Sequence, residues 1–320
     1  MRTWIKLLPF LVFFAASVRA APADPFSDLV RTEQPGWWWL HRADVAPGSP
    51  AILSHITSEL TRVRRLLGLT ATTTPLVVYA ATAADFNLYV ARMGATPQAD
   101  WVAAVAFPTR AVMLLKGPAL KFGALGFETR TLSHELVHLC LGEAGAALPR
   151  WYHEGLAEYL SGEVLDPEWL NAFGAWAARG VLLPLDGLES ELNTSHHRAG
   201  VYYQQCLAFV RFMSERHGDA CHARLLESLR VGQTFDAAFE RALGMTPRAT
   251  EAAWHADLKR NFSWVRAILG YVQLFAIVAV CAAIGFIFVR RRRRATRERM
   301  RDPIDGDNYW DVHPPGGSLQ

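Results

Sequence analysis

The segment His134-Glu135-Leu136-Val137-His138 holds the residues whose types and spacing could do chemistry. On a helix, side chains four positions apart lie on one face, offset by about 40° around the axis and about 6 Å along it. Both imidazoles can therefore bind the same metal ion. Glu135 lies roughly 100° from His134 around such a helix, where its carboxylate can take a proton from a metal-bound water without binding the metal. The segment predicts a zinc site suited to hydrolysis.

The residues around this segment predict the helix that the two imidazoles require. Apolar residues recur at helical spacing from about Glu128 to Leu141, and Gly142 follows as a stop signal. Two His on a helix can also be ordinary buried residues, and the pattern can arise by chance. The helical setting favours the metal site.

A second segment provides the third protein donor that a catalytic zinc ion needs besides its water. It runs from Trp151 to Tyr159 and follows Pro149, a residue common at helix starts. Helical spacing places Glu154 and Glu158 on one face of this segment. One carboxylate can bind the metal while the other supports it.

The two segments resemble those of the gluzincin metallopeptidases, the group that contains thermolysin and the zinc aminopeptidases, and most closely their small peptidase MA-like relatives. In that group, a helix with His-Glu-x-x-His precedes a helix with Trp-x-x-Glu-Gly-x-Ala. The second pattern is matched by Trp151, Glu154, Gly155 and Ala157. The resemblance implies a zincin-like fold and a peptide or protein substrate.

The resemblance also implies a role for each residue of the centre. One Zn²⁺ ion would be held by His134, His138 and Glu154, and Glu135 would be the general base. Glu158 would accept a hydrogen bond from a ligand histidine, which fixes the tautomer and orientation of the ring. The reaction expected is hydrolysis of an amide bond by zinc-bound water, without a covalent intermediate.

Further candidate residues carry weaker signals. Tyr203 resembles the tyrosine whose hydroxyl stabilises the oxyanion in the aminopeptidase branch; a buried core tyrosine is the alternative, and Tyr202 is the substitute. His153 occupies the place of an amide that supports the ligands in those families, or it is a surface residue. His196 and His197 could also reach the site, although a solvated loop is the simpler interpretation.

One departure from the aminopeptidases bears on specificity. Those enzymes carry a Gly-x-Met-Glu-Asn segment whose Glu binds the free amino terminus of the substrate, whereas this chain has no Glu between Leu60 and Phe127. The missing carboxylate favours an endopeptidase over an aminopeptidase, unless Asp100 takes its place.

The ends of the chain predict its location. Residues 1–20 combine Arg2 and Lys6 with an apolar run and small residues, which predicts a signal peptide or an uncleaved anchor. Residues 267–289 contain no charged residue and predict a transmembrane helix. The Arg run that follows predicts a basic, disordered, cytoplasmic tail over 290–320, with partners that the sequence does not name. The catalytic domain would then lie on the periplasmic or extracellular face.

The charge balance and the cysteines indicate which partners and which disulfide the chain could have. Outside the signal peptide and tail, 22 Lys and Arg stand against 25 Asp and Glu, so no nucleic-acid partner is indicated. The Arg run lies directly after an apolar segment, which favours contact with lipid. Cys206 and Cys221 could form a disulfide in an oxidising compartment, or both could be small buried residues.

The fold class expected is α+β. After a short linker over 21–36, one domain over 37–262 would hold a small mixed sheet, then a helical half, with the zinc helix between them. Helices are expected at Ser49–Leu67 and Thr82–Met93, and strands at Trp37–Arg42, Leu76–Ala80, Trp101–Ala106 and Ala111–Leu115. The last strand is the expected sheet edge that binds an extended substrate.

Two functions follow from these observations. The leading hypothesis is a membrane-anchored, outward-facing zinc metallopeptidase. The alternative is a catalytically silent zinc-binding adaptor on the same scaffold, although such a protein would have no need of the base at Glu135.

Overall fold

The structure is a computed structural model of the 320-residue chain. It describes residues 24–45, 48–99, 102–117, 127–145, 148–187, 196–262 and 264–299. The chain divides into two compact units, Met1–Phe262 and Ser263–Gln320. The predicted signal peptide, 1–20, and the side chains of His196 and His197 lie outside the described residues.

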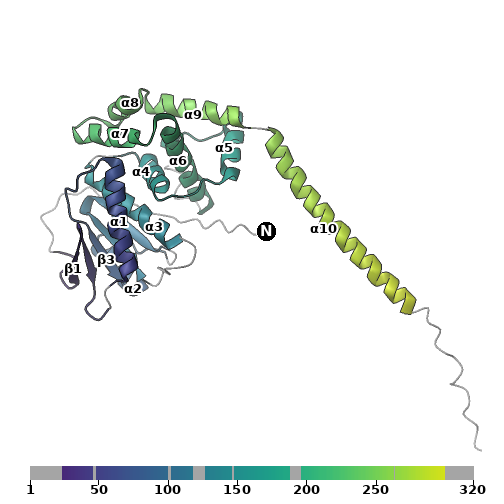
Figure 1. The fold of residues 1–320 in the computed structure, drawn as a ribbon, viewed down its shortest axis with the longest axis horizontal. Helices are drawn as coiled ribbons and strands as arrows, with labels where there is room; N and C mark the ends of the chain where they lie inside the picture. The colour runs from purple at the N-terminus through teal and green to yellow at the C-terminus, as the bar shows by residue number, and fades with distance from the viewer. Residues whose placement is uncertain are drawn as a thin grey trace, which may run out of the picture. The chain divides into compact units, whose positions relative to one another are not determined.

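A five-stranded mixed sheet forms the first half of unit 1 (Figure 1). Its order is β1-β2-β3-β5-β4, with antiparallel pairs at both ends and parallel pairs β2–β3 and β3–β5 between them. The strands are β1 (Val30–Gln34), β2 (Trp37–His41), β3 (Leu76–Ala80), β4 (Ala104–Phe107) and β5 (Val112–Lys116).

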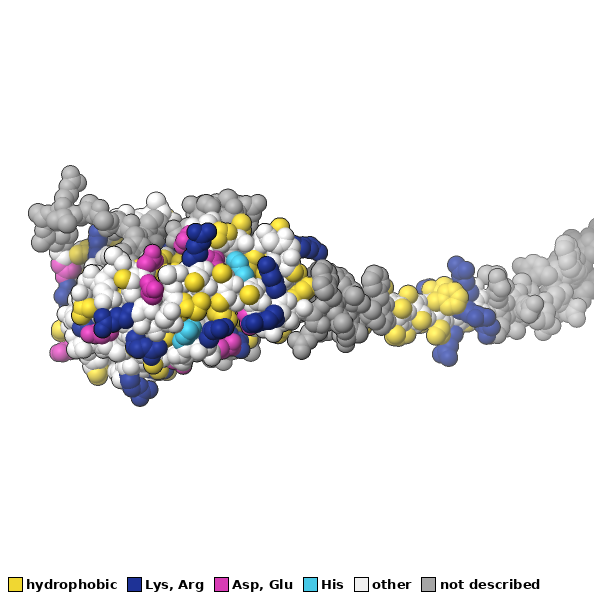
Figure 2. Space-filling view, turned by 90° about the horizontal axis from the view of Figure 1, so that it is seen from above, with side chains coloured by type: hydrophobic (Ala, Val, Ile, Leu, Met, Phe, Trp, Pro, Cys, Tyr) yellow, Lys and Arg dark blue, Asp and Glu magenta, His cyan; other side chains and the backbone are white. Residues whose placement is uncertain are grey.

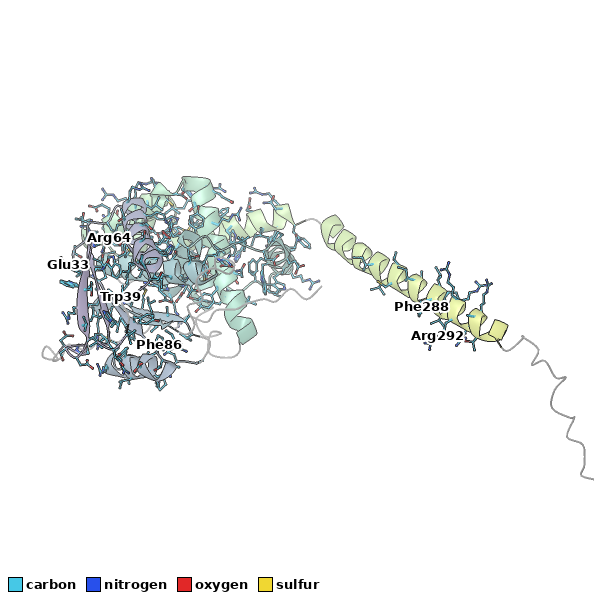
Figure 3. The ribbon with its side chains drawn as sticks, turned by 60° about the horizontal axis from the view of Figure 1, so that its bottom comes forward. Glu33, Trp39, Arg64, Phe86, Phe288 and Arg292 are labelled. Atoms are coloured by element: carbon cyan, nitrogen blue, oxygen red, sulfur yellow. The ribbon has the colours of Figure 1, made fainter. Side chains whose placement is uncertain are left out.

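Helices cover both faces of the sheet. Alternate residues of each strand point to opposite faces, so each strand contributes side chains to two cores. Trp39 lies in the larger core with Val77 and Met113, on the face covered by α1 (Pro50–Leu67). Phe86 of α2 (Ala83–Arg92) lies in a second core on the other face (Figure 3). The helices at Ser49–Leu67 and Thr82–Met93 and the strand at Leu76–Ala80 are therefore confirmed.

Helices make up the second half of unit 1. They are α3 (Phe127–Glu143), α4 (Arg150–Leu160), α5 (Pro167–Arg179), α6 (His196–His217), α7 (Ala220–Arg230), α8 (Phe235–Leu243) and α9 (Pro247–Asn261). α3 contacts α1 and β4 on one side and α4 on the other, so the predicted zinc helix lies between the sheet and the helical half. The predicted α+β organisation is confirmed.

Gly142 does not end α3, which continues to Glu143. A Cβ atom at Gly142 would lie 2.5 Å from the carbonyl oxygen of Pro108, so this glycine lets α3 approach the short 3₁₀ turn Pro108–Arg110 that joins β4 to β5. The prediction that Gly142 ends the helix is therefore wrong; this position requires a glycine because of its close contact with Pro108.

The sheet begins earlier than the sequence predicts. The range 21–36 is expected to be a linker, but β1 lies within it and pairs with β2 through the tight turn at Gly36, whose φ is +83°. β1 is a short exposed edge strand with polar residues, so it lacks the apolar alternation that marks a half-buried strand.

The expected edge strand is not at the edge. β5, which corresponds to Ala111–Leu115, is bonded to β3 on one side and to β4 on the other, and all its residues are buried. β4 is the edge strand beside α3. The apolar composition of β5 marks a central strand.

Unit 2 contains α10 (Trp264–Arg299). The side chains of residues 264–276, which include the start of the predicted span 267–289, lie outside the described residues. Within the described part of the chain, no helix combines the length and the apolar character that crossing a bilayer requires. The prediction of a disordered tail over 290–320 is corrected in part, since α10 continues to Arg299; residues 300–320 are outside the described residues.

The cysteines do not pair. Among the described residues, Cys140, Cys206 and Cys221 are free and buried in the larger core, so the possible Cys206–Cys221 disulfide is not formed and the alternative of small buried residues holds.

Candidate metal centre

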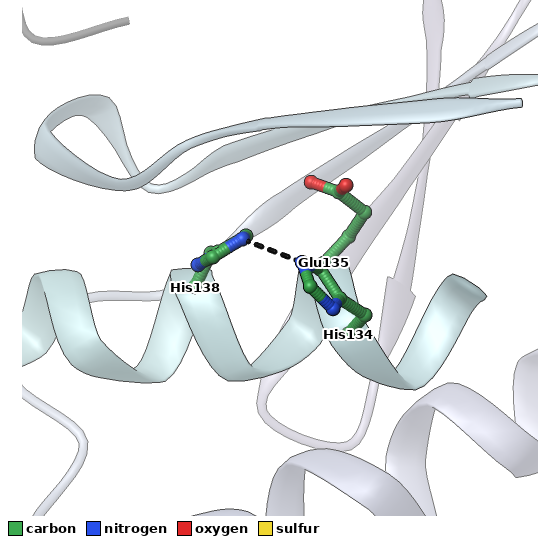
Figure 4. A group of neighbouring side chains, drawn as sticks. All are labelled: His134, Glu135 and His138. Carbon is green, nitrogen blue, oxygen red and sulfur yellow. Dashed lines mark hydrogen bonds between the residues drawn. The ribbon is translucent and has the colours of Figure 1, made fainter. Parts of the chain in front are cut away.

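His134 and His138 lie side by side on α3, one turn apart (Figure 4). Their Nε2 atoms are 3.0 Å apart, and the two rings are nearly perpendicular, with an interplanar angle of 84°. Both side chains are almost fully buried. The helix therefore presents two imidazole nitrogens to one point, as their spacing predicts.

Glu154 of α4 completes this group. Its Oε2 atom lies 3.6 Å from Nε2 of His134 and 3.5 Å from Nε2 of His138. Donors about 2.0–2.1 Å from a tetrahedral zinc ion lie about 3.3 Å from one another, so these separations suit three zinc ligands. The side chain is fully buried, and within the described residues neither carboxylate oxygen has a hydrogen-bond partner. A buried carboxylate without such partners fits a cation.

Glu135 is a second buried carboxylate near the imidazoles, and one of its oxygens lies within 4.8 Å of the His donor atoms. It points from α3 towards the neighbouring strands (Figure 4). The backbone of Ala106 in β4 hydrogen-bonds to it. Because Glu154 meets both imidazoles while Glu135 is held by the sheet edge, the geometry suits Glu154 as ligand and Glu135 as base.

Charges within the centre are strongly coupled. Burial raises the pKa of Glu135 to about 8. Burial alone would lower the pKa of His134, but Glu154 and the nearby carboxylates outweigh it and raise that pKa to about 9. Burial would raise the pKa of Glu154, yet His138 and His134 hold it below its usual range. The carboxylates therefore favour a positive charge at this centre, either a proton on His134 or a bound cation.

Two further predicted residues lie beside the candidate ligands. Oε1 of Glu158 is 3.7 Å from Nδ1 of His134, on the opposite side of the ring from Nε2. The ring of His153 stacks on that of His138, with centroids 4.5 Å apart and planes 15° apart. His153 is buried, so the alternative of a surface residue is wrong. Burial, with His138 nearby, lowers its pKa to about 3.

The tyrosines lie on α6, which packs against α4. Tyr202 and Tyr203 are both buried, and their rings are 5.4 Å apart. Burial raises the pKa of Tyr202, and the charges of Cys206 and Glu154 add to that shift, so Tyr202 is within electrostatic reach of the centre. The catalytic role of Tyr203 stays a prediction.

Sequence reasoning missed the contacts that hold α3 from the side of α1. Ser133 directly precedes His134, and its Oγ atom is 3.2 Å from Nε2 of His55. Glu59 also bonds to Ser133, and Arg62 donates both to Glu59 and to the carbonyl oxygen of Leu160 at the end of α4. Helical spacing of His55, Glu59 and Arg62 on one predicted helix was the available signal, but nothing in the sequence pairs it with Ser133.

Comparison with known proteins places the chain in a family. The family model described as the Peptidase MA superfamily matches residues 58–260, from within α1 to within α9. No curated protein matched the chain. The match covers more than half of the 320 residues and includes both segments of the centre, so the chain belongs to the Peptidase MA superfamily.

Proposed function

We propose that this protein is a zinc-dependent metallopeptidase. The observation that carries the proposal is the convergence of His134, His138 and Glu154, whose donor atoms are 3.0–3.6 Å apart, beside the buried Glu135. When bound there, zinc would polarise the scissile carbonyl and lower the pKa of its water.

The protein's own residues supply the remaining steps. Glu135, a buried carboxylate beside the paired imidazoles, is placed to take a proton from the water and to return it to the leaving amine. Glu158 faces Nδ1 of His134 and orients that imidazole. His134, His138 and Glu154 are at most 2% exposed, so solvent screens their charges only weakly.

Two variants test the zinc and peptidase claims separately. Purified Glu135→Gln protein should keep the wild-type zinc content and lose hydrolysis of a denatured, fluorescently labelled protein. His138→Ala should lose both. Wild-type protein that holds zinc but does not exceed Glu135→Gln in hydrolysis would refute the peptidase claim and favour the silent adaptor.

Cleavage inside chains is the specificity we propose. The support is the absence of a Glu between Leu60 and Phe127, where an aminopeptidase would bind the free amino terminus. Peptides with acetylated and free amino termini should be cleaved at similar rates. A requirement for the free amine would overturn this part of the proposal.

We also propose that residues 267–289 anchor the protein in a membrane, with the peptidase unit outside the cytoplasm. These 23 residues include no Asp, Glu, Lys or Arg. The larger apolar side chains between Ile277 and Val289 are 49–68% exposed, and Arg side chains follow them on α10 (Figure 2). Apolar residues around a whole helix suit lipid.

Membrane fractionation tests the anchor. The full chain should stay with membranes through alkaline carbonate extraction, and externally added protease should digest the peptidase unit of intact cells or spheroplasts. Recovery in the soluble fraction would overturn the anchor, and protection from protease would overturn the orientation.

A further inference from the structure

The two oxygens of Glu154 face different partners. Oε2 faces the Nε2 atoms of the paired imidazoles, at 3.5 and 3.6 Å. Oε1 faces Arg150, whose Nε atom is 3.8 Å away. Arg150 is four residues before Glu154 on α4, so one turn of helix brings the guanidinium over the carboxylate.

The buried position of the Glu154 carboxylate favours a positive charge near each of its two oxygens. Glu154 is fully buried, and neither of its oxygens has a hydrogen-bond partner among the described residues. A buried ionised carboxylate is costly unless charges or hydrogen bonds compensate it. The side chain of Arg150 is 26% exposed, so its stem reaches from the protein surface to the buried oxygen.

Arg150 is badly placed for helix stability. It is the first residue of α4, where the positive end of the helix dipole disfavours a cation. The order of the pair, with the base preceding the acid by four residues, is also the less favourable one. The local energetics of the helix therefore do not favour an arginine here, and its guanidinium lies near Oε1 of Glu154.

We propose that Arg150 is a positioning residue that engages Oε1 of Glu154, so that only Oε2 is presented to the metal. A carboxylate that binds through one oxygen leaves the fourth position of a catalytic zinc ion to water, whereas a second oxygen would compete for it. Arginine suits this task because its planar, permanently charged group holds a carboxylate with fixed geometry. The inference rests on the proposed zinc site.

Metal binding by the purified full-length protein tests the proposal. Arg150→Gln and Arg150→Met both remove the charge, and Met keeps an apolar stem. The zinc affinity, measured by competition with a chromogenic chelator, should fall roughly 10–100-fold in both variants. The visible absorption of the cobalt(II) form, which reports coordination number, should shift from a four-coordinate towards a five-coordinate spectrum.

The matched control is Arg211→Gln, because Arg211 and Glu215 form an exposed pair with the same four-residue spacing on α6. It should change neither quantity. If the Gln variant does not fold, the Met variant decides. Zinc affinity within twofold of wild type, or lower affinity with an unchanged cobalt spectrum, would overturn the proposal. Failure of the wild-type protein to bind zinc would instead refute the zinc site itself.

Discussion

Gly155 of α4 faces the backbone of Cys206 in α6 so closely that a Cβ atom on Gly155 would lie 2.6 Å from the Cys206 carbonyl oxygen. The two helices can approach only because Gly155 has no side chain. Glu154 directly precedes this contact, so the packing of α4 on α6 also sets the position of the candidate ligand.

Gly155→Ala should therefore destabilise the peptidase unit. The added methyl group forces α4 and α6 apart, and overpacking of this kind costs about 1–3 kcal/mol. Denaturant titration of the purified protein measures the free energy of unfolding, and zinc content should fall with it. Gly285→Ala on α10 is the control, since a Cβ there meets no atom within 4 Å. Equal loss in both variants would contradict the packing argument.

Arg64 of α1 and Glu143 of α3 form a buried ion pair between the two helices. Nε of Arg64 is 3.1 and 3.2 Å from the two carboxylate oxygens, and the Glu143 side chain is only 1% exposed. Glu143→Ala should lower the free energy of unfolding by about 3 kcal/mol, because it leaves the guanidinium partly buried without its partner.

The double variant Arg64→Met/Glu143→Leu separates the pair from its packing. Replacement of both charges by apolar residues removes the uncompensated charge, so most of the lost stability should return. A double variant less stable than Glu143→Ala would contradict this explanation, because the loss would then not come from an unpaired Arg64 charge. Chemical unfolding of the two proteins under identical conditions gives the comparison.

Much of the centre could be predicted because the chemistry fixes the spacing. Two imidazoles four residues apart on a helix must share a face, and the pattern around Glu154 places a carboxylate on the next helix. Helical spacing put Glu158 on one face with Glu154, and its contact with a ligand histidine was implied by the resemblance. These predictions depend on local geometry that the sequence specifies directly.

The remaining features depend on contacts between distant segments. The central place of β5 follows from its pairing with both β3 and β4, which no local pattern encodes. We predicted Gly142 to be a helix stop because the residue that it contacts, Pro108, lies far away in the sequence. The role of Arg150 was hidden because a basic residue before a helix pattern usually signals a solvated surface.

His222 predicts how stability depends on pH. Its Nδ1 and Nε2 atoms lie 2.9 Å from the hydroxyl of Tyr152 and 2.8 Å from that of Ser214, and burial lowers its pKa to about 4. The unfolded chain binds the proton near the ordinary pKa of about 6.5, so the contribution of His222 to stability is constant above that pH and falls as pH decreases towards 4. The loss attributable to His222 is about 3 kcal/mol.

Other groups titrate in the same range, so the comparison must be with a His222→Gln variant. Between pH 7 and pH 4, wild type should lose about 3 kcal/mol more unfolding free energy than the variant. Parallel denaturant titrations across this range give the difference at each pH. A difference that stays constant with pH would show that His222 does not carry this dependence.

The hydroxyl of Tyr203 is the remaining candidate for direct stabilisation of the transition state. Loss of one hydrogen bond to a developing oxyanion lowers kcat by about 100-fold or more, with little effect on substrate binding. Tyr203→Phe should therefore reduce kcat by this order, leave KM nearly unchanged and retain zinc. Tyr202→Phe is the matched control, because it removes the neighbouring buried hydroxyl from the same helix. The reverse result would assign the role to Tyr202, and full turnover in both variants would leave oxyanion stabilisation to the metal.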